Sequence, residues 1–259
     1  QSLPAVQLLL SFGADANAVN HVGVTPLGAA VTAGNAHLSE VLLKHGANSN
    51  APMGLGGETP LLTVTRRGDL TLMHLLVKNG ADVNLPDTML TTPLMVSCET
   101  NNADMAAQLL QYGANVAAVR RDGRTVLHLA VVSGCSSELI SLLLKAGAPV
   151  NATAADQSTA LTLAAAVRNI TAARILLHAG ATPTLTGHGG QTALWHAASA
   201  GCYELVQILL DVVGGEEQAA EIALTRGHVD IADIIVARTR KVCNNNPYKP
   251  RSVNRYCIR

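Results

Sequence analysis

The fold of this chain is decided by residues 121–151, which read RDGRTVLHLAVVSGCSSELISLLLKAGAPVN. An opening that contains glycine leads into two apolar stretches separated by a second glycine, and a Gly-Ala pair closes the unit. The opening threonine recurs at Thr25, Thr59, Thr92, Thr125, Thr159 and Thr192, and the closing glycine at Gly13, Gly46, Gly80, Gly113, Gly147 and Gly180. Both markers advance by 33 or 34 residues each time, which predicts an array of stacked units rather than one large core.

Each marker has a physical role, which the first full unit illustrates. Thr25 is expected to cap a helix whose first turn holds Pro26, a position where the missing N–H of proline has no cost. Gly34 is expected to form the turn between two antiparallel helices, and Gly46 to end the second helix in a left-handed cap. One unit should therefore contain a helix, a tight turn and a second helix.

The second helix of each unit is expected to carry one apolar face. Leu38, Val41 and Leu42 are three or four residues apart, so they share a face that must be buried against a neighbouring unit. By the same argument we expect Leu142 and Leu143 to be buried between adjacent units.

The Gly-x-Thr-Pro-Leu opening of residues 23–27 and the Leu-Leu-x-x-Gly-Ala close of residues 42–47 resemble the ankyrin repeat. The resemblance covers roughly residues 4–237 and implies an all-α solenoid of antiparallel helix pairs with hairpin fingers and a concave face. It implies six full repeats between a partial first repeat and a degenerate last one, which we interpret as a capping repeat. We therefore expect an ankyrin-repeat domain at residues 1–237 and a basic linker or tail at residues 238–259.

Some units depart from the pattern. Asn101 stands at the glycine position between the helices and tolerates the left-handed conformation, whereas Arg168 at the equivalent position leaves the geometry of its turn open. Trp195 stands where the family usually has histidine. The finger at residues 48–58 is one residue longer and carries Met53 and Leu55 on a Gly-rich tip, which is either a plain surface feature or a partner contact.

Composition bears on the compartment. No apolar run approaches the roughly 18 residues of a membrane span, and the first ten residues lack the basic start of a signal peptide, so neither is expected. The five cysteines are Cys98, Cys135, Cys202, Cys243 and Cys257, and none forms a Cys-x-x-Cys pair. This pattern indicates reduced thiols in an intracellular protein of the cytoplasm, the nucleus or both, with Cys98 as a core residue.

Charge is unevenly distributed along the chain. Residues 1–237 carry 11 Lys and Arg against 18 Asp and Glu, whereas residues 238–259 carry seven basic residues and no acidic one. The pairs Arg66-Arg67 and Arg120-Arg121, with Arg124 nearby, could suggest nucleic acid. The acidic body and an aromatic content of 2% argue against that partner, so we expect these arginines to meet a protein or to solubilise the rim.

The sequence contains no recognisable catalytic or cofactor motif. There is no phosphate-binding Gly-x-x-x-x-Gly-Lys loop, no nucleophile elbow and no histidine or cysteine set at metal-ligand spacing. His128 and His196 lie in or beside the family's own histidine position, where the ring ties a loop to its neighbour. We therefore expect no enzyme activity, no cofactor, no metal and no membrane partner.

The predicted function is a protein-interaction module, a scaffold or adaptor that binds a protein or peptide on its concave face and fingers. The candidate contact residues are Met53, Leu55, Arg66, Arg67, Met89, Leu90, Arg121, Arg124 and Trp195. Trp195 and Arg121 are the strongest candidates by residue type, because tryptophan and arginine are enriched among interface hot spots.

The tail suggests an alternative, narrower function. Residues 250–257 resemble the opening of the SOCS box of ankyrin-repeat and SOCS-box proteins, with Ser252, Val253 and Cys257 at the matching positions. Valine replaces the usual leucine, the arginine expected directly after the cysteine is instead Arg259, and the rest of the box is missing. The resemblance implies a substrate-recognition subunit of a cullin-RING ubiquitin ligase, with elongin B/C and a cullin as partners. The alternative is a basic tail that packs on the last repeat through a tyrosine.

Overall fold

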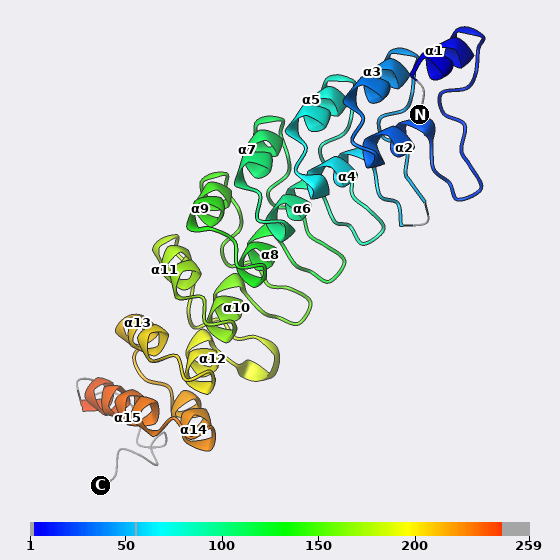
Figure 1. Cartoon of the computed structure of the whole chain (residues 1–259). Coiled ribbons are helices and arrows are strands. Elements are labelled where there is room, and N and C mark those ends of the chain that lie inside the picture. Colours follow the sequence, from blue (N-terminus) through cyan, green and yellow to red (C-terminus); the bar gives the residue numbers. More distant parts are fainter. Residues whose placement is uncertain (1–2, 55, 245–259) are drawn as a thin grey trace. The chain divides into compact units, whose positions relative to one another are not determined.

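The computed structural model describes residues 3–54 and 56–244, with only the backbone given for His188 and residues 241–244 (Figure 1). The described residues form fifteen α-helices, one short 3-10 helix and two isolated β-bridges, without a β-strand. Leu55, Ser252, Val253 and Cys257 lie outside the described residues. The all-α prediction is confirmed.

Six helix pairs follow one another between a single first helix and a final pair. The first helix is α1 (Leu3–Ser11), and the final pair is α14 (Glu217–Thr225) with α15 (Val229–Asn244). The six full pairs are α2 (Pro26–Thr32) with α3 (Ala36–Lys44), α4 (Pro60–Arg67) with α5 (Leu70–Lys78), α6 (Pro93–Glu99) with α7 (Ala103–Gln111), α8 (Val126–Val132) with α9 (Ser137–Lys145), α10 (Ala160–Ala166) with α11 (Ile170–His178), and α12 (Ala193–Ser199) with α13 (Tyr203–Val213). The 3-10 helix η1 (His188–Gly190) precedes α12. The predicted repeat count is confirmed.

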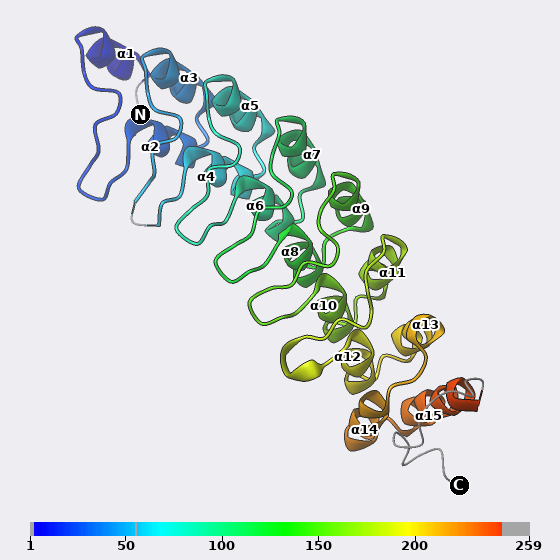
Figure 2. The same cartoon turned by 180° about the vertical axis from the view of Figure 1, so that it is seen from behind.

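The chain divides into two compact units. The first comprises the residues up to 121 together with residues 145–148, and the second comprises residues 122–144 and those from 149 onward. In the first unit the inner helices α2, α4 and α6 pack in one row, and α3 packs beside α5 in an outer row (Figures 1 and 2). In the second unit α8, α10, α12 and α14 form the inner row, and α11, α13 and α15 the outer row.

Threonine caps start the inner helices, as predicted. The Thr25 hydroxyl oxygen accepts a hydrogen bond from the Gly28 N–H at 3.0 Å, and Pro26 occupies the first turn of α2. The same cap recurs at Thr59, Thr92, Thr159 and Thr192. Because the side chain satisfies an N–H that has no partner inside the helix, it fixes where these five inner helices begin.

The turns between paired helices are left-handed whether or not glycine occupies them. Gly34 has a φ of 69°, Asn101 of 50° and Arg168 of 58°. The prediction for Asn101 is confirmed, and the geometry that the sequence left open at Arg168 is that of the glycine turns. Arginine carries a Cβ, so this conformation is strained there, and the packed helices on either side must offset the strain.

Asparagine side chains connect successive repeats. The Asn50 amide donates to the Gly80 carbonyl oxygen at 2.9 Å, and its oxygen accepts from the Asp82 N–H at 2.8 Å. Asn17 and Asn84 make the same pair of bonds in the first unit, and Asn151 in the second. Each amide thus satisfies a carbonyl near the end of an outer helix and fixes the start of the next finger.

The core consists of thin apolar layers between the helix rows. Leu38, Val41 and Leu42 are buried, as is Cys98, in agreement with the sequence predictions. The prediction for α9 is right for Leu143, which is fully buried, and wrong for Leu142, which is only half-buried. The buried face of α9 consists of Leu139, Ile140 and Leu143, so Leu142 lies on the flank of that face.

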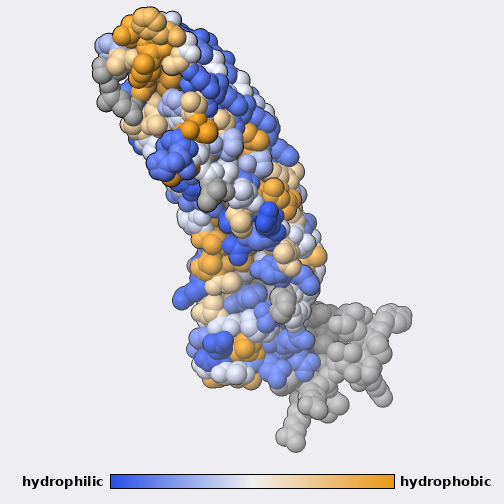
Figure 3. Space-filling view, turned by 90° about the vertical axis from the view of Figure 1, so that its right-hand side faces the viewer, coloured by the Kyte–Doolittle hydropathy of each residue, from blue (hydrophilic) through white to orange (hydrophobic). Residues whose placement is uncertain are grey.

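The two ends of the array differ in polarity. The exposed residues of the last repeat include Glu221, Arg226, Asp230 and Asp233, which is the polar outer surface expected of a capping repeat. Helix α15 continues to Asn244, so the domain boundary predicted between residues 237 and 238 lies inside it. At the other end α1 buries none of its residues, and Figure 3 shows hydrophobic surface where α1 lies.

None of the described helices is both long enough and apolar enough to cross a membrane.

Candidate protein-interaction surface

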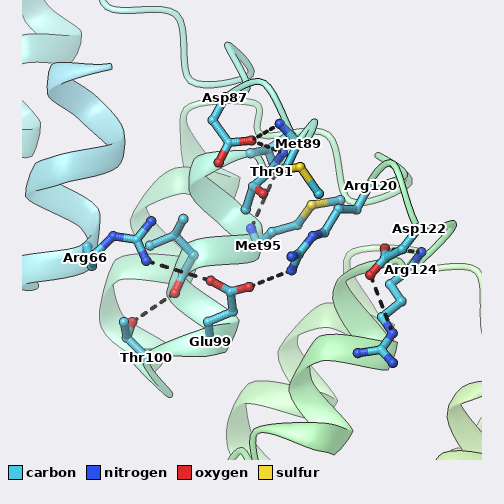
Figure 4. Close-up of polar contacts among 12 residues, drawn as sticks. Arg66, Asp87, Met89, Thr91, Met95, Glu99, Thr100, Arg120, Asp122 and Arg124 are labelled. Carbon is cyan, nitrogen blue, oxygen red and sulfur yellow. Dashed lines mark hydrogen bonds and ion pairs between the residues drawn. The ribbon is translucent and has the colours of Figure 1, made fainter. Parts of the chain in front are cut away.

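A charged cluster links three elements of the first unit. Glu99, the last residue of α6, receives a hydrogen bond from Arg120 Nη1 at 2.9 Å, and Arg66 Nη1 on α4 lies 3.9 Å from its second oxygen. Figure 4 shows the two guanidinium groups approaching this carboxylate from opposite sides. The Arg66 side chain is 50% exposed and that of Arg120 only 24%, so Arg66 is the more accessible cation.

The finger that precedes α6 presents two apolar side chains. Met89 is 44% exposed and Leu90 46% exposed, and the Asp87 carboxylate accepts hydrogen bonds from the N–H groups of Met89 and Thr91. Leu90 has a φ of 61°, a left-handed conformation that is uncommon for a leucine. The turn around Asp87 thus holds an apolar pair at the tip in a strained backbone.

Arg121 lies next to this apolar pair. Its backbone N–H donates to the Met89 carbonyl oxygen at 3.0 Å, which joins two successive fingers. The residue is exposed, and its guanidinium has no ion-pair partner among the residues that the structure describes. We call Met89, Leu90 and Arg121 the tip patch; it combines two apolar side chains with one available cation.

Two other predicted contact residues pack between repeats. The half-buried Met53 places its thioether where a Cβ of Gly28 would lie. Arg67 donates from Nη1 to the carbonyl oxygen of Thr32, the last residue of α2, at 2.5 Å. Both side chains therefore contribute to the contact between adjacent repeats, and their role toward a partner stays a prediction.

In the second unit Arg124 and His128 belong to one polar arrangement. Arg124 Nε lies 3.7 Å from the Asp122 carboxylate. The buried His128 accepts the Thr125 N–H at Nδ1, and its Nε2–H donates to the Ser158 carbonyl oxygen at 3.0 Å. Burial lowers the pKa of His128, opposed by the bond to Ser158, and the charge of Arg124 lowers it further. The histidine thus ties its helix to the next finger, as the family resemblance implied.

Trp195 also lies in the second unit, at the third position of α12. Its half-buried ring meets that of His196 edge to face, with ring centres 5.1 Å apart, and burial lowers the pKa of His196. The indole is one wall of a cleft of about 380 Å³, which we call the Trp195 cleft. Its other lining residues are Gly189, Gln191, Gln218, Glu221, Ile222 and Thr225.

The structure brings together some of the predicted residues and adds one that was missed. Met89, Leu90 and Arg121 are adjacent, whereas Arg124 and Trp195 belong to the other unit. Glu99 was not predicted, yet it stands seven residues after Thr92, as Arg66 does after Thr59. Comparing equivalent positions in successive repeats would have revealed this pair of opposite charges.

Among the described residues no group of three or more histidines, cysteines and carboxylates is placed to hold a metal ion.

Comparisons with known proteins agree on the family. The profile for ankyrin repeats (3 copies) matches residues 1–87, 64–154, 94–187, 135–219 and 161–246. An ankyrin repeat-containing protein of Treponema pallidum is 40% identical over 111 residues, 42% of this chain and 37% of the relative. Human ankyrin repeat and SOCS box protein 16 is 35% identical over 115 residues, 44% of this chain and 25% of that protein.

Solved structures give the same result. The crystal structure of an ankyrin repeat domain from Acinetobacter baumannii superposes with a TM-score of 0.66 at 29% identity, over 70% of this chain and 93% of that one. The two curated relatives are much longer than the matched segment, since the chain spans 37% and 25% of their lengths. The period, the helix pairs and these matches together show that the chain belongs to the ankyrin-repeat family.

Proposed function

We propose that this ankyrin-repeat protein is a non-catalytic interaction module that binds a protein or peptide through its inner helices and fingers, as a scaffold or adaptor. The single observation that carries the proposal is the tip patch, in which Leu90 and Met89 are exposed beside the available guanidinium of Arg121. An exposed apolar pair next to an arginine is typical of interface anchors. We place this function inside the cell because of the cysteine pattern.

The conformation of Leu90 adds support. A left-handed leucine costs on the order of 1 kcal/mol or more, a strain that glycine at this position would not have. Strained positions cluster at ligand-contacting sites, because a side chain with a role is retained despite the cost. An exposed side chain that contributes little to the core but is held in such a conformation favours a contact with something outside the chain.

The proposed surface also includes residues of both units. The first unit contributes Met53, Leu55, Arg66 and Arg67, and the second contributes Arg124 and Trp195. Arg66 can leave its longer contact with Glu99 for a partner carboxylate, because that contact spans 3.9 Å at an exposed site. The sequence motifs of common enzymes are absent, so binding alone is proposed, without a reaction, a cofactor, nucleic acid or a membrane.

The test compares two sets of substitutions in the first unit. Proteins captured from a cell extract by the wild-type chain would be quantified again with Met89→Ser, Leu90→Ser and Arg121→Ser combined. The control combines Lys78→Ser with Tyr112→Ser, which are exposed residues of the outer layer. We expect a specific partner to be lost with the tip-patch variant only. A partner lost only with the control would place binding on the outer helices and refute the proposed surface.

A second candidate function is substrate recognition for a cullin-RING ubiquitin ligase. Its support is the tail motif with Ser252, Val253 and Cys257, together with the similarity to a human protein whose name includes a SOCS box. In this proposal the tail binds elongin B/C, which recruits a cullin, while the repeats hold the substrate.

The test of the second function keeps α15 intact. The chain would be co-expressed with elongin B and elongin C, with and without residues 245–259, because α15 extends to Asn244. Val253→Asp with Cys257→Asp should abolish co-purification, since two carboxylates would enter an apolar pocket. If the wild-type chain, extended to its natural end, does not retain elongin subunits, this function is excluded and the plain interaction module stands.

A further inference from the structure

In two of the repeats, the third position of the inner helix meets the finger that follows. In the second unit His128 donates to the Ser158 carbonyl oxygen in the next finger. In the first unit Gly28 has no side chain, and Met53 of the next finger fills the space instead. In both cases the next finger covers this position of the inner helix.

Trp195 occupies the same position in the sixth full repeat, but the finger that should cover it is missing. Only three residues, 214–216, separate α13 from α14, whereas fourteen residues, 179–192, separate α11 from α12. Three residues cannot form the hairpin that covers the equivalent position elsewhere. The indole of Trp195 therefore borders an open cleft that continues onto α14.

The cleft combines an aromatic wall with polar groups. Trp195 and Ile222 provide apolar surface, while Gln191, Gln218 and Thr225 provide uncharged polar groups. The lining contains one charged side chain, Glu221. This carboxylate is exposed and has no ion-pair partner among the described residues, so it can attract a cation from solution.

Acidic residues gather on α14 and directly before it. No lysine or arginine occurs between Arg174 and Arg226. Of the five carboxylate residues in that stretch, Glu204 pairs with Arg174 and Asp211 with Arg238, which leaves Glu216, Glu217 and Glu221. The Glu216 carboxylate accepts the Thr192 hydroxyl at 2.6 Å, at the junction that replaces the missing finger. A cationic ligand matches this lining, because its one charged side chain is a carboxylate.

We propose that the Trp195 cleft binds a lysine or arginine side chain of a protein partner, with the cation over the indole and close to Glu221. This inference rests on the proposed interaction function and specifies the chemistry of one of its subsites. A cation over tryptophan is the most favourable pairing of its kind, and a nearby carboxylate adds charge attraction. A volume of about 380 Å³ accommodates one long side chain with its flanking backbone.

The experiment uses the fact that Trp195 is the only tryptophan of the chain. Its fluorescence would be followed while the whole chain is titrated with a heptapeptide in which one arginine is flanked by glycines and serines. We expect a saturable change with this peptide and with its lysine counterpart, and none with peptides that carry glutamine or glutamate instead. Absence of a saturable change with both basic peptides would overturn the proposal.

Two variants with the same change in net charge locate the effect. Glu221→Gln should weaken peptide binding by about three- to tenfold, because it removes the carboxylate of the cleft. Asp233→Asn removes one charge from the exposed surface of α15, outside the cleft lining, and should leave the affinity unchanged. Equal weakening in both variants would mean general charge attraction and would refute the cleft as the site.

The basic end of the chain is a competing occupant. A chain without residues 245–259 should bind the arginine peptide with the same affinity as the full chain. A much higher affinity after this truncation would mean that the tail occupies the cleft, and the external partner would be refuted.

The two proposals fail in different ways. If the peptide does not bind but the tip patch still binds its partner, only this subsite is refuted. Loss of partner capture by the control variant alone would instead refute the proposed surface of the first unit.

Discussion

The thioether of Met53 fills the space that a side chain at Gly28 would occupy. This packing takes the place of the contact that His128, at the equivalent position of α8, makes with its next finger. Gly28 lies inside α2, where alanine is normally better than glycine by about 0.5 to 1 kcal/mol. Here we expect the opposite sign, because a Cβ would overlap the Met53 side chain.

The prediction is that Gly28→Ala destabilises the protein by about 1 to 3 kcal/mol, the usual cost of overpacking. Chemical denaturation would measure this loss of unfolding free energy. The double variant Gly28→Ala with Met53→Ala should lose less than the sum of the losses in the two single variants. A stabilising effect of Gly28→Ala alone would mean that Met53 does not pack there.

Substitutions at Leu90 can separate the backbone strain at this residue from the contribution of its side chain to partner binding. Leu90→Gly should stabilise the protein by about 1 kcal/mol by releasing the left-handed strain, less the entropy that glycine adds to the unfolded chain. Leu90→Ala keeps the strain and should leave stability within about 0.5 kcal/mol of the wild type. Both substitutions should weaken partner binding, which titration calorimetry would measure. If the Leu90→Gly protein binds the partner as well as wild type does, Leu90 is not part of the proposed binding surface.

His128 should make stability depend on pH. Burial holds its folded pKa below the unfolded value of 6.5, so the unfolded chain takes up the proton first as the pH falls. Its contribution to stability is therefore fully present above pH 6.5 and is lost as the pH falls from there toward the folded pKa.

The measurement compares unfolding free energies of wild type and His128→Gln at several pH values. The wild-type protein should lose more stability on acidification through this window than the variant does. His21→Gln, a change at an exposed histidine, is the matched control. Parallel pH profiles for wild type and His128→Gln would show that His128 is not the titrating group.

Leu143 and Leu142 test the register of α9. Leu143→Ala should cost about 2 to 5 kcal/mol because its side chain is fully buried between the helix rows. Leu142→Ala should cost clearly less, since that side chain is half-buried. Equal losses in urea melts would contradict the buried face drawn through Leu139, Ile140 and Leu143.

The fold could be predicted because its determinants are local and periodic. The cap at Thr25 and the turn at Gly34 each depend on residues a few positions apart, and their recurrence every 33 or 34 residues makes the pattern unmistakable. The partial burial of Leu142 was not predicted, because the Leu-Leu-Leu run alone cannot show which leucine lies on the flank of the buried face.

The candidate site was harder to predict because its contacts join residues one period apart. Met53 and Arg67 look like free surface residues within their own repeat. Their space and hydrogen-bond partner come from Gly28 and Thr32 in the preceding repeat. The lining of the Trp195 cleft joins residues of η1, α12 and α14, and only the fold brings these elements together.

The asparagine bonds between repeats have a consequence for how such a chain can evolve. The Asn50 side chain bonds only to backbone atoms of the next repeat. At the four sites the N–H that reaches the asparagine oxygen comes from Asn48, Asp82, Asn115 or Thr182. The joint therefore places no demand on the side chain it meets. A duplicated segment of one period would bring its own asparagine and find matching backbone groups at both of its ends. The gene could gain a repeat in one event, without a compensating substitution elsewhere at this joint.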